Sequence, residues 1–411
     1  MAIEIRTMRE EETPAWLECT TTTFFEQIDL ARVAEEVKPL WDFGRVWGAL
    51  DGELVVGTLR TWASELTLPG AGRLPAASVS GVSVRATHRR TGILSRLVEA
   101  EHAAARERGE AVAMLYASEY PIYGRFGYGP ASPMATWTID TAATGFHRPP
   151  SGSVEFAPAS VETRDAMKVV FDAWRFRQPG EIRRRDFSWD FDLALRESVW
   201  GTAWKGFVAL HRDAAGTVDG YVRYRGEEKW EHRQPRAIVS VDELHALTDD
   251  AYDALWQFLA GMDLVKTIRA ERRSPIERFP WLLTNARAAE PSEMGDGLWV
   301  CLLDIPRALA SRAYEREGSI VIEVIERAGT AAERRTNVAL DATPAGATCA
   351  PTDRSPDLTL DAAALGAAYL GGTRLRDAVA TRGSDEHTPD ALARADALFA
   401  TLDSPWCSTF F

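Results

Sequence analysis

The fold of this chain is decided by residues 79–130, which read VSGVSVRATHRRTGILSRLVEAEHAAARERGEAVAMLYASEYPIYGRFGYGP. Residues 82–86 alternate apolar and polar side chains, as in a half-buried strand. From Gly92 the apolar period becomes helical, and Gly109 is a natural end for that helix. The uncharged run 111–117 then predicts a buried strand, which is followed by a tyrosine-bearing turn. This order of elements indicates an α/β unit.

Gly81 lies where the strand pattern breaks. Val79 is out of phase with the alternating residues that follow it, and a one-residue phase shift at a glycine is what a β-bulge produces. Such a bulge would splay this strand from its neighbour. We therefore expect a slot for a thin ligand at this end of the strand.

The turn between strand and helix is basic and ends in a glycine. Backbone N–H groups and the dipole at a helix start attract anions, and two arginines beside them suit a pyrophosphate. An isolated arginine pair is more often a solvated turn, but the strand–turn–helix frame favours phosphate binding. Acetyl-CoA pairs a pyrophosphate with a reactive thioester, so we expect an acyltransferase. The residues expected to bind that cofactor are Arg89, Arg90, Thr91, Gly92 and Ile93.

The composition of the 411 residues is that of an ordinary globular protein. At about 100–200 residues per domain, this length predicts roughly two to four domains. The formal net charge of −13 argues against nucleic acid as a partner and mildly favours cationic substrates. No run approaches the ~20 apolar residues that span a bilayer, and the start of the chain is charged where a signal peptide is apolar. We therefore expect a cytoplasmic protein with no membrane partner.

The cysteine and histidine patterns predict no metal site. The four cysteines include no Cys-x-x-Cys pair, and the seven histidines include no His-Glu-x-x-His motif. No cysteine lies in residues 79–130, which favours direct acyl transfer over a covalent acyl-enzyme. A Ser-His-Asp hydrolase is disfavoured as well, because no Gly-x-Ser-x-Gly motif is present.

Three units are predicted along the chain, at residues 1–150, 151–295 and 296–411. The second unit repeats the strand–helix–strand order of the first over residues 238–270. Its connecting turn, 246–250, carries acids and no glycine and should repel a pyrophosphate, so we interpret this unit as a degenerate second copy. The third unit mixes strands with alanine-rich helices, as a small α/β domain does.

The second unit also contains the run Arg183-Arg184-Arg185. Neither a strand nor a glycine frames it, so a solvated or interface-lining charge run is favoured over a specific anion site. The run is therefore not part of the predicted site.

The chain ends in an aromatic tail, Ser404-Pro-Trp-Cys-Ser-Thr-Phe-Phe411. Most termini are polar and frayed, but this one has no charged side chain, so we expect it to dock into the body of the protein. Docking would carry the Phe411 α-carboxylate, whose ordinary pKa is about 3.5, into an interior site where burial raises its basicity. The alternative is a hydrophobic tail that only plugs a domain.

These motifs resemble a known family. Arg89-x-x-Gly92-x-Leu94 resembles the pyrophosphate loop of GNAT acetyltransferases, although Leu94 stands where a small residue is usual. The strings 82–92, 117–119 and 122–130 are similar to the Eis (enhanced intracellular survival) family of actinobacterial acetyltransferases, and the resemblance covers essentially the whole chain. It implies an α/β fold with mixed sheets, in which an N-terminal catalytic and a central degenerate GNAT-like unit precede a sterol-carrier-like domain. It also implies a homohexamer.

The resemblance further implies where the reacting groups lie. Tyr123 would be the general acid that protonates the departing thiolate; plain aromatic packing is the alternative, and the competing tyrosines are Tyr116, Tyr120 and Tyr128. The carboxylate of Phe411 would be the base at the substrate amine. Ser118 would contact the pantetheine or the acetyl group. Backbone N–H groups that would donate to the thioester carbonyl belong to Val82, Ser83 and Val84.

An amine site for polycations needs carboxylates and aromatic walls. The resemblance points to Phe24, Phe25 and Glu26, and Glu119, which follows the second strand, is a further substrate candidate. Weaker candidates are Glu36 and Trp41. We predict an acetyl-CoA-dependent N-acetyltransferase that acts on small polycationic amines, aminoglycosides first, by direct transfer in a ternary complex. The alternatives are a protein-lysine acetyltransferase and a non-catalytic carrier of acyl-CoA or lipid.

Overall fold

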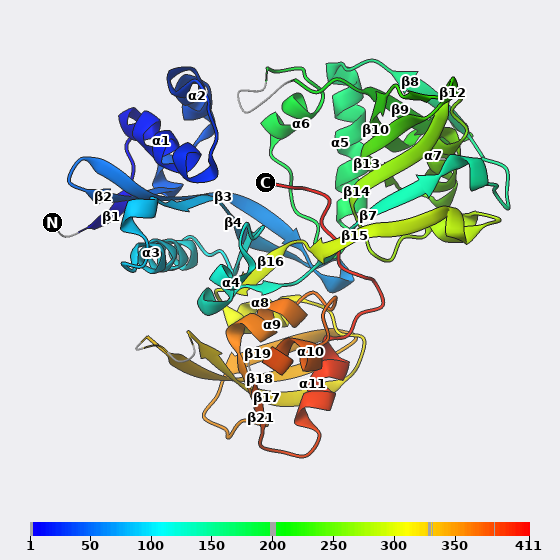
Figure 1. The fold of residues 1–411 in the computed structure, drawn as a ribbon. Helices are drawn as coiled ribbons and strands as arrows, with labels where there is room; N and C mark the ends of the chain where they lie inside the picture. Colours follow the sequence, from blue (N-terminus) through cyan, green and yellow to red (C-terminus); the bar gives the residue numbers. More distant parts are fainter. Residues whose placement is uncertain (1–2, 198–202, 328–329, 331, 382) are drawn as a thin grey trace.

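Three large β-sheets with helices packed on them organise the chain (Figure 1). Parallel and antiparallel strand pairs both occur, so the predicted α/β fold with mixed sheets is confirmed. Among the described residues, no helix is long and apolar enough to cross a membrane. The computed structural model describes every residue except 1–2, 198–202, 328–329, 331 and 382.

The first sheet has the strand order β1-β2-β3-β4-β5-β16-β6. Helix α3 (Ile93–Glu107) connects the parallel strands β4 and β5 and packs its apolar face on the sheet. Helices α1 (Thr13–Phe24) and α2 (Leu30–Val37) pack near β2 and β3. The strands are β1 (Glu4–Thr7), β2 (Val46–Asp51), β3 (Leu54–Thr67), β4 (Arg73–Val84), β5 (Val112–Leu115), β16 (Trp299–Leu302) and β6 (Gly129–Pro130).

A bulge in β4 confirms the expected break at Gly81. The register of β3 and β4 shifts there, so two residues of β4 face one of β3. Gly81 has a φ of +60°, and a Cβ atom at this position would lie 2.5 Å from the Trp16 ring, so only glycine fits. The parallel register of β4 with β5 runs from Ala76 to Ser78, and residues 79–84 then part from β5. The expected splayed strands are present.

The second sheet has the strand order β15-β7-β14-β13-β10-β9-β8. Its strands β13 and β14 run parallel and are connected by α7 (Asp249–Ala260), which repeats the arrangement of β4, α3 and β5. Helix α5 (Val161–Arg175) packs on the same sheet, and α6 (Asp186–Asp192) follows it. The strands are β15 (Ala289–Asp296), β7 (Pro133–Asp140), β14 (Val265–Arg273), β13 (Ala237–Ala246), β10 (Val218–Glu227), β9 (Phe207–Arg212) and β8 (Ser153–Ala157), with a small hairpin of β11 (Trp230–Glu231) and β12 (Gln234–Pro235).

The sheets do not follow the predicted boundaries at 150/151 and 295/296. Strand β7 comes from the first 150 residues but lies in the second sheet, between β15 and β14. Strand β16 comes from the predicted third unit but lies in the first sheet, between β5 and β6. Each of these strands pairs with strands from a distant part of the chain, and local composition does not predict such pairing.

The third sheet has the strand order β19-β18-β17-β20-β21. Helix α9 (Ala362–Ala368) lies between this sheet and the first one, and every one of its residues is buried. After α11 the chain runs back toward the second sheet, where its red C-terminal end lies in Figure 1. The other elements are β19 (Gly346–Pro351), β18 (Arg334–Thr343), β17 (Gly318–Glu326), β20 (Leu358–Asp361), β21 (Ser384–Glu386), α8 (Ile305–Ser311), α10 (Leu375–Ala378) and α11 (Ala391–Phe399).

Candidate functional site

A cavity of about 1010 Å³, called here the first cavity, lies at the parted end of β4. Its walls are the second half of β4, the basic turn, the start of α3, the segment after β5 and the end of α1. The predicted cofactor residues that line it are Val82, Ser83, Val84, Arg89, Arg90, Gly92, Ile93 and Ser118. Thr91 does not line the cavity. Its hydroxyl donates to the His88 carbonyl at 2.6 Å and so closes the turn instead.

Backbone N–H groups of β4 face the gap left by β5. The Arg85 N–H donates to the Val56 carbonyl of β3 at 2.9 Å. N–H directions alternate along a strand, so the N–H groups of Val84 and Val82 point away from β3. On that side β4 has already lost its register with β5. The β4 slot, meaning the gap between residues 79–84 and β5, therefore offers hydrogen-bond donors to a ligand.

The start of α3 is open and positively charged. Gly92 precedes the helix with a φ of +80°, and no side chain caps the N–H groups of the first turn. The side chains of Arg89 and Arg90 are exposed, and neither forms an ion pair with any residue that the structure describes. An uncapped helix start beside two free guanidinium groups is a site for a polyanion.

Of the four candidate tyrosines, Tyr123 alone lines the first cavity. It ends the short helix α4 (Tyr120–Tyr123), and its side chain is buried. Burial, assisted by the charge of Glu119, raises the Tyr123 pKa to about 12, so its hydroxyl keeps its proton at neutral pH. The hydroxyl of Tyr128 lies 2.9 Å from His102 Nε2, and Tyr120 is exposed.

The aromatic tail, residues 404–411, docks into the protein as its composition predicts. Tyr116, directly after β5, donates its hydroxyl to the Thr409 carbonyl at 2.9 Å. The Phe411 ring packs edge-on against Tyr116 at 5.3 Å and against Trp62 at 5.2 Å. Phe411 lines a separate second cavity of about 250 Å³ rather than the first. The tail nevertheless contacts Tyr116 at the end of β5. Ser118, two residues further along the chain, lines the first cavity.

The predicted substrate residues divide between two places. Phe24 and Glu119 line the first cavity, as does Phe25. Glu26 is exposed and lines neither cavity, because the chain turns away after α1. The weaker candidates serve local packing: Glu36 pairs with Arg32, and the ring of Trp41 packs on Trp16.

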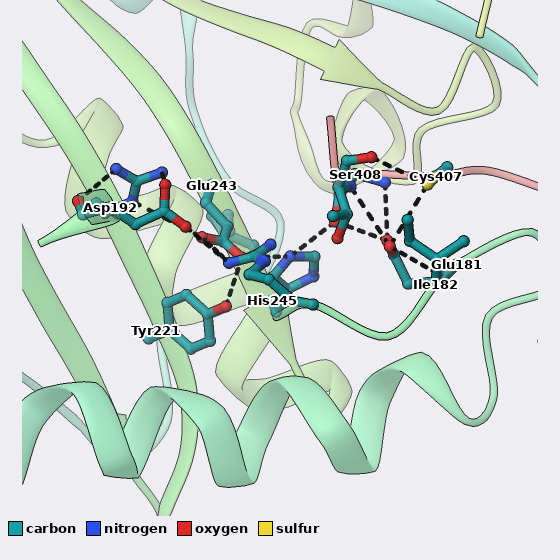
Figure 2. A network of polar contacts seen from close by, with 12 residues as sticks. Glu181, Ile182, Asp192, Tyr221, Glu243, His245, Cys407 and Ser408 are labelled. Atoms are coloured by element: carbon teal, nitrogen blue, oxygen red, sulfur yellow. Dashed lines mark hydrogen bonds and ion pairs between the residues drawn. The ribbon is translucent and has the colours of Figure 1, made fainter. Parts of the chain in front are cut away.

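The arginine run 183–185 lines the interface between the first and second sheets, one of the two alternatives expected from sequence, and Arg183 is exposed. Arg184 pairs with Glu243, with Nη2 2.8 Å from Oε1. Figure 2 shows Glu243 near Tyr221 and His245. The Arg185 guanidinium lies over the Trp62 ring at 3.9 Å, and burial lowers its pKa to about 10. All three arginines line the second cavity. Sequence analysis did not identify the partners, because they come from β13 and β3.

Comparisons with known proteins agree with this layout. Residues 4–131 and 180–303 each match an "Acetyltransferase (GNAT) domain" family, and residues 305–408 match the "Sterol carrier protein domain" family. An uncharacterized N-acetyltransferase of Streptomyces griseus is 37% identical over 100% of both chains. The N-acetyltransferase Eis of Mycobacterium tuberculosis is 34% identical over 86% of this chain and 85% of its own.

Solved structures show the same three-part arrangement. Eis1 from Mycobacterium abscessus superposes with a TM-score of 0.85 at 31% identity, covering 99% of this chain and 100% of that chain. A GCN5-related N-acetyltransferase from Anabaena variabilis superposes with a TM-score of 0.83 at 18% identity over 100% of both chains, which is a likeness of fold.

Proposed function

The chain belongs to the Eis family of GNAT N-acetyltransferases, and from that premise we propose that it transfers acetyl from acetyl-CoA to a primary amine of an aminoglycoside or similar polycation. The observation that carries the proposal is the first cavity, where the β4 slot meets an uncapped helix start with two free arginines. The diphosphate of CoA suits the helix start, and its thin pantetheine arm suits the slot.

The thioester is activated by backbone donors of β4. The N–H groups of Val82 and Val84 face the β4 slot, so a carbonyl oxygen held there accepts hydrogen bonds as negative charge develops on it. These donors are fixed by the bulge and need no reorganisation during the reaction. Ser118, on the opposite wall, contacts the pantetheine or acetyl end.

Tyr123 supplies the proton that the departing thiolate takes up. Its side chain lines the first cavity and stays protonated, because its pKa is raised to about 12. A thiol has an ordinary pKa of about 8.5, so this proton transfer depends on the geometry of the site rather than on matched acidities.

The terminal carboxylate of Phe411 accepts the proton that the attacking amine loses. The tail brings Phe411 against Tyr116 at the end of β5, next in the chain to the wall of the first cavity. Transfer is direct, in a ternary complex. Cys19 lies close by, with Sγ 3.7 Å from Ser83 Oγ, but burial raises its pKa and suppresses the thiolate that an acyl-enzyme requires.

The substrate class follows from the resemblance and from the net charge of −13, which raises the local concentration of polycations. Phe24 and Glu119 offer an aromatic wall and a carboxylate at the first cavity. A homohexamer is carried over from the same resemblance. Light scattering tests it through a particle mass near six times the 45.4 kDa of one chain.

The decisive experiment mixes the protein with acetyl-CoA and kanamycin and follows free CoA with a thiol reagent. Thiol release together with a mass gain of one acetyl group on the aminoglycoside is expected. The panel includes polyamines and lysine peptides, so turnover of peptides alone would identify a protein-lysine acetyltransferase. Tight binding of CoA without turnover of any amine would refute the proposal and favour a carrier.

A further inference from the structure

The parallel strands of the second sheet also part. Their register runs from Ala237 on β13 to Val241 opposite Ala270 on β14, and the register of β13 with β10 shifts by one residue beside Asp242. Beyond this bulge, residues 243–246 of β13 have lost their register with β14. We call this gap the β13 slot. By element order it corresponds to the β4 slot of the first sheet.

The chain's own tail lies across the β13 slot. The Trp406 indole N–H donates to the Arg272 carbonyl on β14 at 2.8 Å. Two residues later, Ser408 Oγ lies 3.3 Å from His245 Nε2 on β13. The Trp406 ring also packs on the Arg273 guanidinium at 4.6 Å. Residues 406–408 therefore bridge the two parted strands.

One carboxylate fastens the tail in this position. Glu181 Oε2 accepts from the Ser408 N–H at 2.8 Å and from the Ser408 hydroxyl at 2.7 Å. Its other oxygen accepts from the Thr409 N–H at 3.4 Å, the Cys407 thiol at 3.5 Å and the Ile182 N–H at 3.0 Å. Figure 2 shows the Glu181 carboxylate turned toward Cys407 and Ser408.

The burial of Glu181 makes its bonds to the tail costly to lose. The residue is 0% exposed, and it forms no ion pair with any cation that the structure describes. Its charge is satisfied by neutral donors, and all but the Ile182 N–H belong to the tail. Release of the tail would remove four of the five donors that Glu181 accepts from, leaving the Ile182 N–H.

The backbone of Glu181 is tied to the first sheet. The Thr67 N–H at the end of β3 donates to the Glu181 carbonyl at 2.9 Å, and the Gly180 N–H donates to the Thr67 carbonyl at 2.8 Å. A bridge between Leu66 and Ile182 continues this pairing. Glu181 therefore joins the second sheet's tail site to β3, the strand that pairs with the bulged β4.

We propose that Glu181 is a positioning residue, which holds the tail in the β13 slot so that Phe411 stays against Tyr116 at the end of β5. The inference rests on the proposed role of Phe411 as the base. It gives the second sheet a part in the reaction. The acidic start of α7 repels a diphosphate from the β13 slot, and the tail, which carries the base, lies in that slot instead.

The first test measures release of the tail and needs no substrate. Carboxypeptidase digestion of Glu181→Gln should free Phe411 roughly 10- to 100-fold faster than in the wild type, because the amide presents N–H groups to donors. Ser408→Ala, which removes only the hydroxyl donor, should give roughly a 3- to 10-fold increase. Asp219→Asn is the matched control. Asp219 is also a buried carboxylate of the second sheet, but it bonds His211 and Thr248, away from the tail.

The second test separates positioning from folding. Glu181→Gln should lower kcat in proportion to tail release and leave KM for acetyl-CoA unchanged, because the first cavity contains neither Glu181 nor the tail. Glu181→Asp should restore part of the lost kcat, since it keeps the charge. Asp219→Asn should lower stability with wild-type kcat.

The outcomes are distinct. Wild-type rates of digestion in both Glu181→Gln and Ser408→Ala would overturn the docking role. A freed tail with unchanged kcat would overturn its effect on the reaction. If the wild type acetylates no amine, the proposed function fails, and the digestion result still decides whether Glu181 holds the tail.

Discussion

The first and second sheets share one arrangement and differ in what it holds. In both, a bulged strand runs parallel to its partner, the pair parts near the bulge, and a helix connects the two strands. The helix of the first sheet follows Gly92 with no side-chain cap and an arginine pair beside it. The helix of the second sheet follows Thr248, whose side chain caps the first turn, and two aspartates open that turn.

This difference indicates that parted strands alone are not sufficient to form a cofactor site. Charge and capping at the helix start decide whether a diphosphate is attracted or repelled. In the second sheet the acidic, capped start leaves the parted strands to a different occupant, and the tail's Trp406 and Ser408 bond across them.

The largest effect on kcat is expected at Tyr123, because the proposed chemistry takes place in the first sheet. Tyr123→Phe keeps the ring and removes the proton, so kcat should fall roughly 10²- to 10⁴-fold, as for other general acids. Tyr120→Phe is the matched control, since Tyr120 is exposed and does not line the first cavity. Steady-state rates of both variants check this, and equal rates would refute the role of Tyr123.

The pH dependence gives a second check on the same residue. Burial and the charge of Glu119 raise the Tyr123 pKa to about 12, so the protonated form persists through neutral and mildly alkaline pH. The wild-type kcat should therefore show no decline from loss of this proton below about pH 11. A decline centred near pH 9 that disappears in Tyr123→Phe would contradict this.

Giving the first helix start the acidic character of the second should abolish cofactor binding. The double variant Arg89→Asp/Arg90→Asp replaces two charge-assisted contacts with repulsion, so the Kd of acetyl-CoA should rise roughly 10²- to 10³-fold. Arg148→Asp/Arg316→Asp makes the same change in net charge at exposed positions outside the first cavity and should bind normally. Calorimetry on both variants separates the local effect from the overall charge, and equal affinities would contradict it.

A substitution in the core of the second sheet should lower the stability of the protein and leave its affinity for the cofactor unchanged. Glu243→Gln breaks a buried pair with Arg184 and should lower the free energy of unfolding by about 3 kcal/mol, with the Kd of acetyl-CoA unchanged. Urea unfolding at neutral pH measures this loss. A weaker affinity for acetyl-CoA would show that the two sheets are not separable in this way.

The same variant has a defined pH dependence. Burial favours the protonated form of Glu243, but Arg184 and His245 outweigh it and hold its pKa well below 4.5. A depressed carboxyl pKa stabilises the fold above the ordinary value and loses that contribution as pH falls through the depressed one. The stability difference between wild type and Glu243→Gln should therefore shrink below about pH 4.5.

The smallest expected effect lies where the tail meets the first sheet. Arg185 lies over Trp62, whose ring contacts Phe411, and a guanidinium there repels a polycationic substrate. Arg185→Gln should raise kcat/KM for an aminoglycoside about 2- to 5-fold and leave a monoamine nearly unaffected. A fall for the aminoglycoside would indicate that this arginine contacts a different, anionic part of the substrate.

The features predicted from sequence are those with a local cause. The bulge at Gly81 shows as a phase shift within a few residues, and the arginine pair precedes its helix directly in the chain. The degenerate character of the second helix start was visible in the same way, as acids where the first has a glycine and cations. Each depends on neighbours in sequence, which periodicity and composition report.

The features that sequence analysis missed depend on partners far along the chain. Glu181 bonds Ser408, which lies more than 200 residues away in the sequence, so the sequence around either residue does not indicate its partner. The Arg184 side chain is buried beside Glu243 on β13, a partner that its neighbours in the sequence do not indicate. Strands β7 and β16 cross between sheets for the same reason, since strand pairing is a property of the assembled fold.

The central claim is that one slot of the two accepts the cofactor and the chain's own tail fills the other. Titration of CoA into the intact protein, followed by calorimetry, tests it most directly. One CoA per chain is expected, with that binding lost in Arg89→Asp/Arg90→Asp and kept in Glu181→Gln. Two CoA molecules per chain, or none, would contradict the account.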